Sequence, residues 1–126
     1  MIHIDRQSRV PVFEQIKNEL MKLIALGVLE PHSRLPSIRQ IAAETGVNIN
    51  TVKKAFAELE MHGVIYSVPG TGSFVNLNAL SDENLRKNAF LEVETAVKAA
   101  KAKGIAMDEV LALIRDLYNK EDANDD

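Results

Sequence analysis

The chain has 126 residues, a formal net charge of −3 and no cysteine, and 46% of its residues are hydrophobic. This length fits one or at most two small domains, and the lack of cysteine excludes disulfides, thiolate metal sites and cysteine nucleophiles. The longest apolar runs are about five residues, far below the ~18 of a transmembrane helix. The N-terminus also lacks the pattern of a secretory signal, so we expect a cytoplasmic protein with no membrane partner.

The charges are unevenly distributed along the chain. Residues 1–78 hold 8 Lys or Arg against 7 Asp or Glu, a net charge of +1, whereas residues 79–126 hold 7 against 11, a net charge of −4. Such asymmetry suggests that the two halves do different work. We therefore expect two domains, one at residues 1–78 and one at residues 79–126.

Two helices are predicted first. Apolar residues recur at spacings of three and four from Pro11 to Gly27, which is typical of a helix with one buried stripe. A short strand is expected in the connection that follows, at residues 34–35. Ser37 and Gln40 then form a capping-box pattern, so a second helix is predicted to begin at Ser37 and to end near Gly46.

A third helix and a hairpin follow closely. Asn48 can cap a helix only about three residues after the second one ends, which is the pattern of a helix-turn-helix. β-branched and aromatic residues at 64–68 and 73–75 predict two strands around a glycine-rich tip at 69–72. A hairpin in this position is called a wing. The predicted fold class is therefore mainly α with a small β-hairpin, a winged helix-turn-helix followed by helices.

Two more amphipathic helices are predicted in the second half, separated at Gly104. A two-helix tail cannot bury both apolar stripes by itself, but two copies can form a small bundle. The chain is therefore expected to be a homodimer. The candidate dimerisation residues are Leu85, Ala89, Val93, Val97, Val110, Leu111, Ile114, Leu117 and Tyr118.

The third helix carries the main candidate site. Asn50, Lys53, Lys54 and Ala57 follow the i, i+3, i+4, i+7 spacing of one helical face, away from the apolar stripe. An α-helix fits the DNA major groove, where Asn can bond adenine and Lys can bond guanine or a phosphate. Taken alone, such residues are more often ordinary solvated side chains. The capping box before them and the hairpin after them favour DNA binding.

Two further features point to phosphate contacts. Arg39 is near the start of the second helix, an end whose amides and dipole attract anions. Gly70 and Gly72 permit a sharp turn or a close approach to a partner at the wing tip. An ordinary surface arginine and an ordinary hairpin tip are the alternatives.

The residues present no pattern of an enzyme. The glycine-rich tip lacks the Gly-Lys-Ser/Thr ending of a phosphate-binding loop, and a strand follows it instead of a helix. The three histidines are about thirty residues apart and make no metal-ligand spacing. No nucleophile elbow is present. We therefore expect neither catalysis nor a cofactor or metal.

Residues 35–75, LPSIRQIAAETGVNINTVKKAFAELEMHGVIYSVPGTGSFV, resemble the winged helix-turn-helix of the GntR family of bacterial transcription regulators. With the first helix included, the resemblance covers about residues 9–76. The remainder is too short for a large effector-binding domain. It is similar to the tail of the YtrA subfamily, whose members dimerise through a brief helical tail and are often linked to transporter operons.

The resemblance implies a set of DNA contacts and shows three departures. Ile49 replaces a residue that is basic or polar in many members, and could touch a thymine methyl instead. Lys53 replaces a frequent arginine and lacks its planar fork, and His32 stands where glycine is common. The implied DNA-binding residues are Arg39, Asn48, Asn50, Thr51, Lys53 and Gly70, with Thr71 and Gly72 as neighbours; Ile49 and, from its helix face, Lys54 complete the candidate set.

The sequence thus predicts a homodimeric regulator, most simply a repressor, with one winged domain on each half of a palindromic DNA operator. A winged-helix adaptor that binds proteins is the alternative from another class, since the chain is net acidic. A third hypothesis is a sensor whose helical tail holds a pocket for a small-molecule effector. The operator sequence, the regulated genes and the effector cannot be deduced from the residues.

Overall fold

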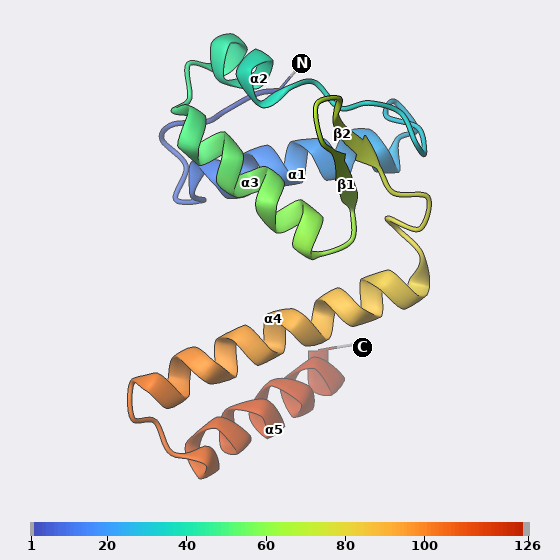
Figure 1. The fold of residues 1–126 in the computed structure, drawn as a ribbon. Coiled ribbons are helices and arrows are strands. Elements are labelled where there is room, and N and C mark those ends of the chain that lie inside the picture. Colours follow the sequence, from blue (N-terminus) through green and yellow to red (C-terminus); the bar gives the residue numbers. More distant parts are fainter. Residues whose placement is uncertain (1, 125–126) are drawn as a thin grey trace. The chain divides into compact units, whose positions relative to one another are not determined.

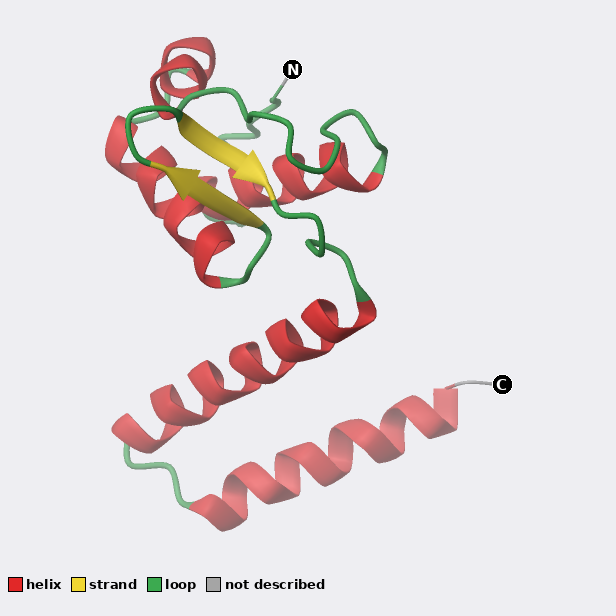
Figure 2. Cartoon of the chain, turned by 45° about the vertical axis from the view of Figure 1, so that its right-hand side comes forward, coloured by secondary structure: helices red, strands yellow, loops and turns green. Residues whose placement is uncertain are grey.

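The computed structural model describes residues 2–124. Its described part contains five helices and one antiparallel pair of strands, which confirms the predicted fold class (Figures 1 and 2). The elements are α1 (Val12–Ala25), α2 (Ile38–Thr45), α3 (Ile49–Met61), β1 (Ile65–Val68), β2 (Gly72–Val75), α4 (Asp82–Ala102) and α5 (Met107–Asn124).

The chain divides into two compact units, residues 1–85 and 86–126. The first turn of α4 belongs to the first unit because Asn84 holds it there. The Asn84 side-chain amide donates hydrogen bonds to the carbonyl oxygens of Ala79, at 2.8 Å, and His62, at 3.1 Å. The first compact unit therefore includes the start of the helix that follows the hairpin.

Local signals in the sequence set the helix-turn-helix. The Ser37 hydroxyl accepts a hydrogen bond from the Gln40 amide at 3.0 Å, and the Gln40 side chain accepts one from the Ser37 amide at 2.8 Å. This reciprocal pair confirms the capping box. Gly46 ends α2 with φ +71°, a conformation that glycine adopts at little cost. Asn48 then caps α3 by accepting from the Asn50 amide at 2.8 Å.

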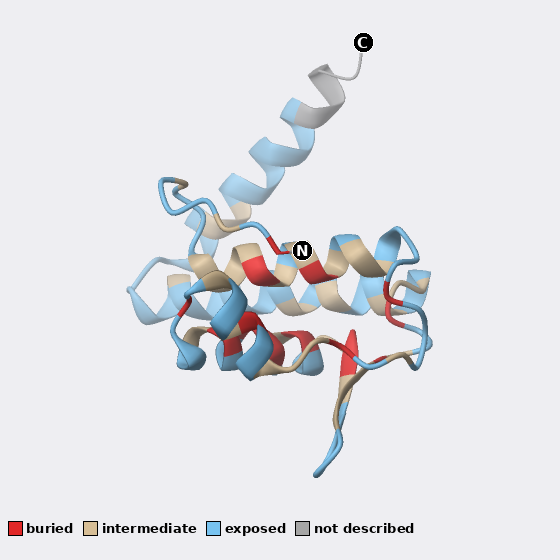
Figure 3. Ribbon diagram, turned by 90° about the horizontal axis from the view of Figure 1, so that it is seen from above, coloured by how far each residue is buried: buried red, intermediate tan, exposed pale blue. Residues whose placement is uncertain are grey.

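The core of the first unit forms where α1, α2 and α3 meet the hairpin (Figure 3). Each helix contributes its apolar stripe to this core. The largest fully buried side chains are Ile16, Leu20, Ile41, Val52, Leu59, Val64, Ile65 and Val75. Since this burial fixes the angle between α2 and α3, it also fixes the residues that α3 exposes.

The hairpin gains a third backbone segment from the connection between α1 and α2. Arg34 forms an isolated antiparallel bridge with Phe74, as the predicted short strand requires. The Leu35 amide donates to the Ser73 carbonyl at 2.9 Å, and the Val75 amide donates to the Ser33 carbonyl at 3.0 Å. β2 is therefore paired on both sides, by β1 and by this segment.

Removing the α2 cap has a predictable cost. Ser37→Ala is expected to lower the free energy of unfolding by about 1 kcal/mol, because the Gln40 amide loses its partner. Chemical denaturation measures the difference. Ser67→Ala is the matched control, since among the described residues the Ser67 hydroxyl makes no hydrogen bond. Equal stabilities of the two variants would contradict the role of the cap.

The second unit consists of two helices joined at Gly104, whose φ is +79°. In α4, no residue is buried. Lys98 pairs with Glu94 at 2.8 Å, and this hydrogen bond and charge hold the pKa of Glu94 below its ordinary value. Within residues 2–124, no helix has both the length and the apolar character needed to span a membrane.

Candidate nucleic-acid interface

The exposed face of α3 is opposite its four buried residues. Val52, Ala55, Phe56 and Leu59 point into the core, and Asn50, Lys53 and Ala57 are exposed. Among the described residues, Lys53 has neither an ion-pair nor a hydrogen-bond partner. Its positive charge is therefore free to meet an external anion or a base edge.

Lys54 lies at the border of this face, beside α1. Its ammonium is 3.9 Å from the centre of the Phe13 ring, a cation–π contact. One turn further along α3, Glu58 accepts a hydrogen bond from Lys17 of α1 at 3.0 Å. The edge of α3 that faces α1 is thus engaged in packing, so Lys53 and Lys54 do not stand in equivalent positions.

The remaining predicted residues lie at the start of the two helices. Arg39 is exposed in the first turn of α2 and has no ion-pair partner among the described residues. Asn48 and Ile49 are exposed at the start of α3, and Thr51 is half-buried. Because Asn48 uses its side-chain oxygen for the cap, the Nδ2 group is the part of this residue that remains for a partner.

The wing tip is a tight turn that depends on Gly70. The Thr71 amide donates to the Val68 carbonyl at 3.0 Å, and Gly70 at the third turn position has φ +74°. Gly70 and Thr71 are exposed, whereas Gly72 is half-buried. The tip therefore presents backbone atoms and one hydroxyl to a partner.

His32 occupies a position that favours glycine. Its φ is +62°, which is the left-handed region that glycine adopts at little cost. The His32 Nδ1 atom lies 2.9 Å from the Tyr66 hydroxyl, and the Tyr66 ring stacks on Phe74 with centroids 5.7 Å apart. His32 thus contributes to the packing of the wing.

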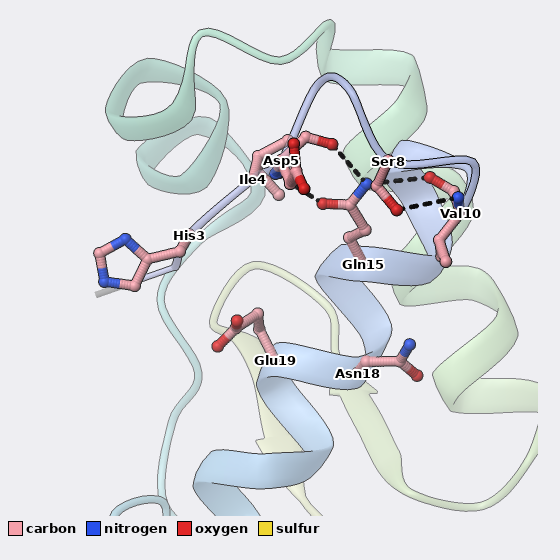
Figure 4. A pocket seen from close by; sticks show the side chains of 8 residues that line it. All are labelled: His3, Ile4, Asp5, Ser8, Val10, Gln15, Asn18 and Glu19. Atoms are coloured by element: carbon pink, nitrogen blue, oxygen red, sulfur yellow. Dashed lines mark hydrogen bonds between the residues drawn. The ribbon is translucent and has the colours of Figure 1, made fainter.

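A cation of the N-terminal segment also lies on the helix-turn-helix. The Arg6 Nη2 atom donates to the Thr45 carbonyl at the end of α2, at 3.1 Å. Gln15 of α1 fixes this segment, because its side chain accepts from the Asp5 amide and donates to the Asp5 and Val10 carbonyls (Figure 4). The sequence pattern did not indicate Arg6, since a single arginine before the first helix has no distinctive spacing.

The tail exposes most of its predicted dimerisation residues. Val110 and Leu111 are half-buried, and the rest of that set is exposed. Phe90 is 62% exposed and was not among the predicted dimerisation residues. Its spacing of three and seven residues from Val93 and Val97 places it on the same helical face and could have identified it. Side chains of α4 and α5 also line an apolar cavity of about 510 Å³ near their connection.

Comparison with known proteins settles the family. A family model described as bacterial regulatory proteins, gntR family, matches residues 13–75, from α1 to the end of β2. The chain belongs to the GntR family. Members and relatives are transcription regulators rather than enzymes, in agreement with the predicted class.

Two curated relatives of this GntR chain come from Bacillus subtilis (strain 168). The HTH-type transcriptional repressor YtrA is 40% identical over 79 residues, which are 63% of this chain and 61% of YtrA. The chain therefore spans about three fifths of the length of YtrA. An uncharacterised HTH-type regulator, YhcF, is 32% identical over 110 residues, covering 86% of this chain and 91% of YhcF.

Solved structures are similar in fold to nearly all or part of the chain. YtrA from Sulfolobus acidocaldarius, a GntR-family transcription factor, aligns with a TM-score of 0.56 at 33% identity, over 94% of this chain and 97% of that one. The DNA-binding domain of AraR in complex with operator ORE1 aligns with a TM-score of 0.52 at 29% identity, over 60% of this chain and 92% of that one.

Proposed function

We propose that this GntR chain is a repressor that binds a palindromic DNA operator as a homodimer. The observation that carries the proposal is the exposed face of α3, where Asn50 and the unpaired Lys53 project from a helix braced by the core. YtrA is named a repressor, and the AraR domain was solved on an operator. Control of a transporter operon and a cytoplasmic location are parts of the same proposal.

Each predicted residue has a distinct role in this mechanism. The N-terminal turns of α3 enter the major groove, where Asn50 and Lys53 contact base edges and Ile49 meets a thymine methyl. Arg39 binds a phosphate beside the groove, and the tip at Gly70 and Thr71 approaches the adjacent minor groove. Asn48, Thr51 and Lys54 lie at the edge of the α3 surface that contacts the major groove. Gly72 is the last residue of the wing tip and the first of β2.

The tail supplies the dimer. A two-helix unit in which α4 buries no residue leaves its apolar side chains in water, and covering them with a second copy removes that cost. The resulting two-fold symmetry matches two half-sites of a palindrome. In this proposal residues 1–78 read DNA and residues 79–126 assemble the dimer.

Salt dependence tests DNA binding against the protein-adaptor hypothesis. We expect the affinity for an operator selected from random duplexes to fall steeply with salt, with a slope of about −0.9 in log–log form for each phosphate neutralised. Fluorescence anisotropy at several KCl concentrations measures the slope. Absence of binding to any selected duplex, at low salt as well, would contradict the proposal and favour the adaptor.

The cavity in the tail favours a second candidate function, a regulator that senses an apolar small molecule. Its lining is apolar except for Lys101, so a ligand with a hydrocarbon body and one acidic group fits its chemistry. A thermal-shift screen of metabolites identifies such an effector. A hit that stabilises the protein and also releases DNA supports sensing, and a screen without one contradicts it.

A further inference from the structure

Arg34 is held beside the wing by backbone pairing. It lies opposite Phe74 in the antiparallel bridge, and hydrogen bonds on both sides of it, from Leu35 to Ser73 and from Val75 to Ser33, fix its position. In an antiparallel pairing, a residue lies on the same face of the sheet as its partner and as the residues two positions before and after that partner. The residue two positions before Phe74 is Gly72, the first residue of β2 after the tip.

The guanidinium of Arg34 rests against Gly72. A Cβ atom placed on Gly72 would lie 2.9 Å from the Arg34 Nε atom and 3.5 Å from its Cζ atom. The 2.9 Å distance is too short for a Cβ atom beside a side-chain nitrogen, so the guanidinium would have to move. The absence of a side chain at residue 72 is therefore what lets the guanidinium lie on the wing. Gly70 is different, because a Cβ atom there would meet nothing within 4 Å.

The charge of Arg34 is not neutralised within the described part of the chain. Arg34 is exposed and makes no ion pair with any described residue. It also borders a surface depression of about 570 Å³ that Ser37 and Gln40 of the α2 cap line as well. Arg34 thus lies between two parts of the proposed interface, the wing and the first turn of α2.

We propose that Arg34 is a phosphate-binding residue of the DNA interface, and that Gly72 acts by positioning it. The proposal rests on the DNA-binding function proposed above. A guanidinium presents a planar fork of N–H donors that matches phosphate oxygens, and the packing on Gly72 orients this fork beside the wing tip. Because Arg34 would contact the DNA phosphate backbone and not a base, its contribution to affinity should be independent of the DNA sequence.

A double-mutant cycle on the full chain tests both parts. The dissociation constants for a selected duplex and a random duplex are measured over a range of KCl concentrations for Arg34→Ala, Gly72→Ala and the double variant. Arg34→Ala is expected to weaken both duplexes about 3- to 10-fold at low salt and to lower the salt slope by about one per protomer. Gly72→Ala should cause a similar loss, and the double variant should lose little more.

Matched variants separate this effect from strain and from net charge. Gly70→Ala also places alanine at a positive φ, +74° against +140° at Gly72, but without meeting Arg34, so its loss should add to that of Arg34→Ala. Lys87→Ala removes one exposed charge from α4 and should leave the salt slope unchanged. Arg34→Lys keeps the charge without the fork and should recover the slope in part. Thermal unfolding of each variant checks that it is folded.

The outcomes are distinguishable. If Arg39→Ala and Lys53→Ala weaken binding whereas Arg34→Ala leaves affinity and slope unchanged, the role of Arg34 is refuted and the proposed function stands. If the losses from Arg34→Ala and Gly72→Ala simply add, Gly72 does not act through Arg34. If the unmodified chain binds no duplex, the proposed function itself fails.

Discussion

Val97→Asp is expected to convert the proposed dimer into a monomer and to weaken operator binding at least about a hundredfold. Val97 is exposed on α4 and also lines the apolar cavity beside α5. A carboxylate there would be buried without a partner in the two-copy bundle, which is strongly unfavourable. Once the two winged domains are no longer linked, the gain from binding both half-sites together, about 10²- to 10⁴-fold, is lost.

Light scattering at micromolar concentration and operator titration measure the two effects on the same sample. Ala99→Asp is the matched control, because it adds the same charge to α4 outside the predicted apolar stripe and should leave both properties unchanged. A Val97→Asp variant that stays dimeric would contradict the assignment of the interface. A monomeric variant with unchanged affinity would contradict the need for two linked domains.

Lys53→Ala is expected to reduce the preference for the operator over random DNA. Lys53 is exposed on α3 and has no partner among the described residues, and a base contact from such a residue is worth about 1 to 3 kcal/mol. A dimer loses this contact in both half-sites. Since the proposed role of Lys53 is to read a base, the loss on the selected duplex should greatly exceed the loss on a random one.

Arg39→Ala is the comparison that distinguishes a base contact from a phosphate contact. Because a phosphate contact carries no sequence information, we expect Arg39→Ala to weaken both duplexes by a similar factor and to reduce the salt slope. Competition titrations with both duplexes measure the ratio. If Lys53→Ala also weakened the selected and the random duplex equally, Lys53 would be excluded from base recognition.

The elements that sequence alone predicted are those set by local chemistry. The reciprocal bonds of Ser37 and Gln40, the left-handed Gly46 and the Asn48 cap each involve residues close together in the chain. The helices of the tail were predicted from apolar periodicity, which is also a pattern among residues close together in the chain. These signals, with the turn at Gly70, were enough to predict the winged helix-turn-helix and its exposed α3 face.

The details that sequence could not provide depend on contacts between distant segments. Lys54 and Lys53 are adjacent in sequence, and only the approach of α1 places the Phe13 ring under Lys54. Arg34 became a candidate only through its pairing with β2, and Arg6 only through its bond to Thr45. Propensity and periodicity contain no information about such pairings.

Selection of duplexes from a random pool by the full chain tests the central claim most directly. We expect enrichment of an inverted repeat whose half-sites are centred about 10 base pairs, one helical turn, apart, and we expect Lys53→Ala to weaken the enrichment. A pool that remains random after repeated rounds would contradict sequence-specific recognition by this protein. An enriched site without two-fold symmetry would contradict the homodimer on a palindrome.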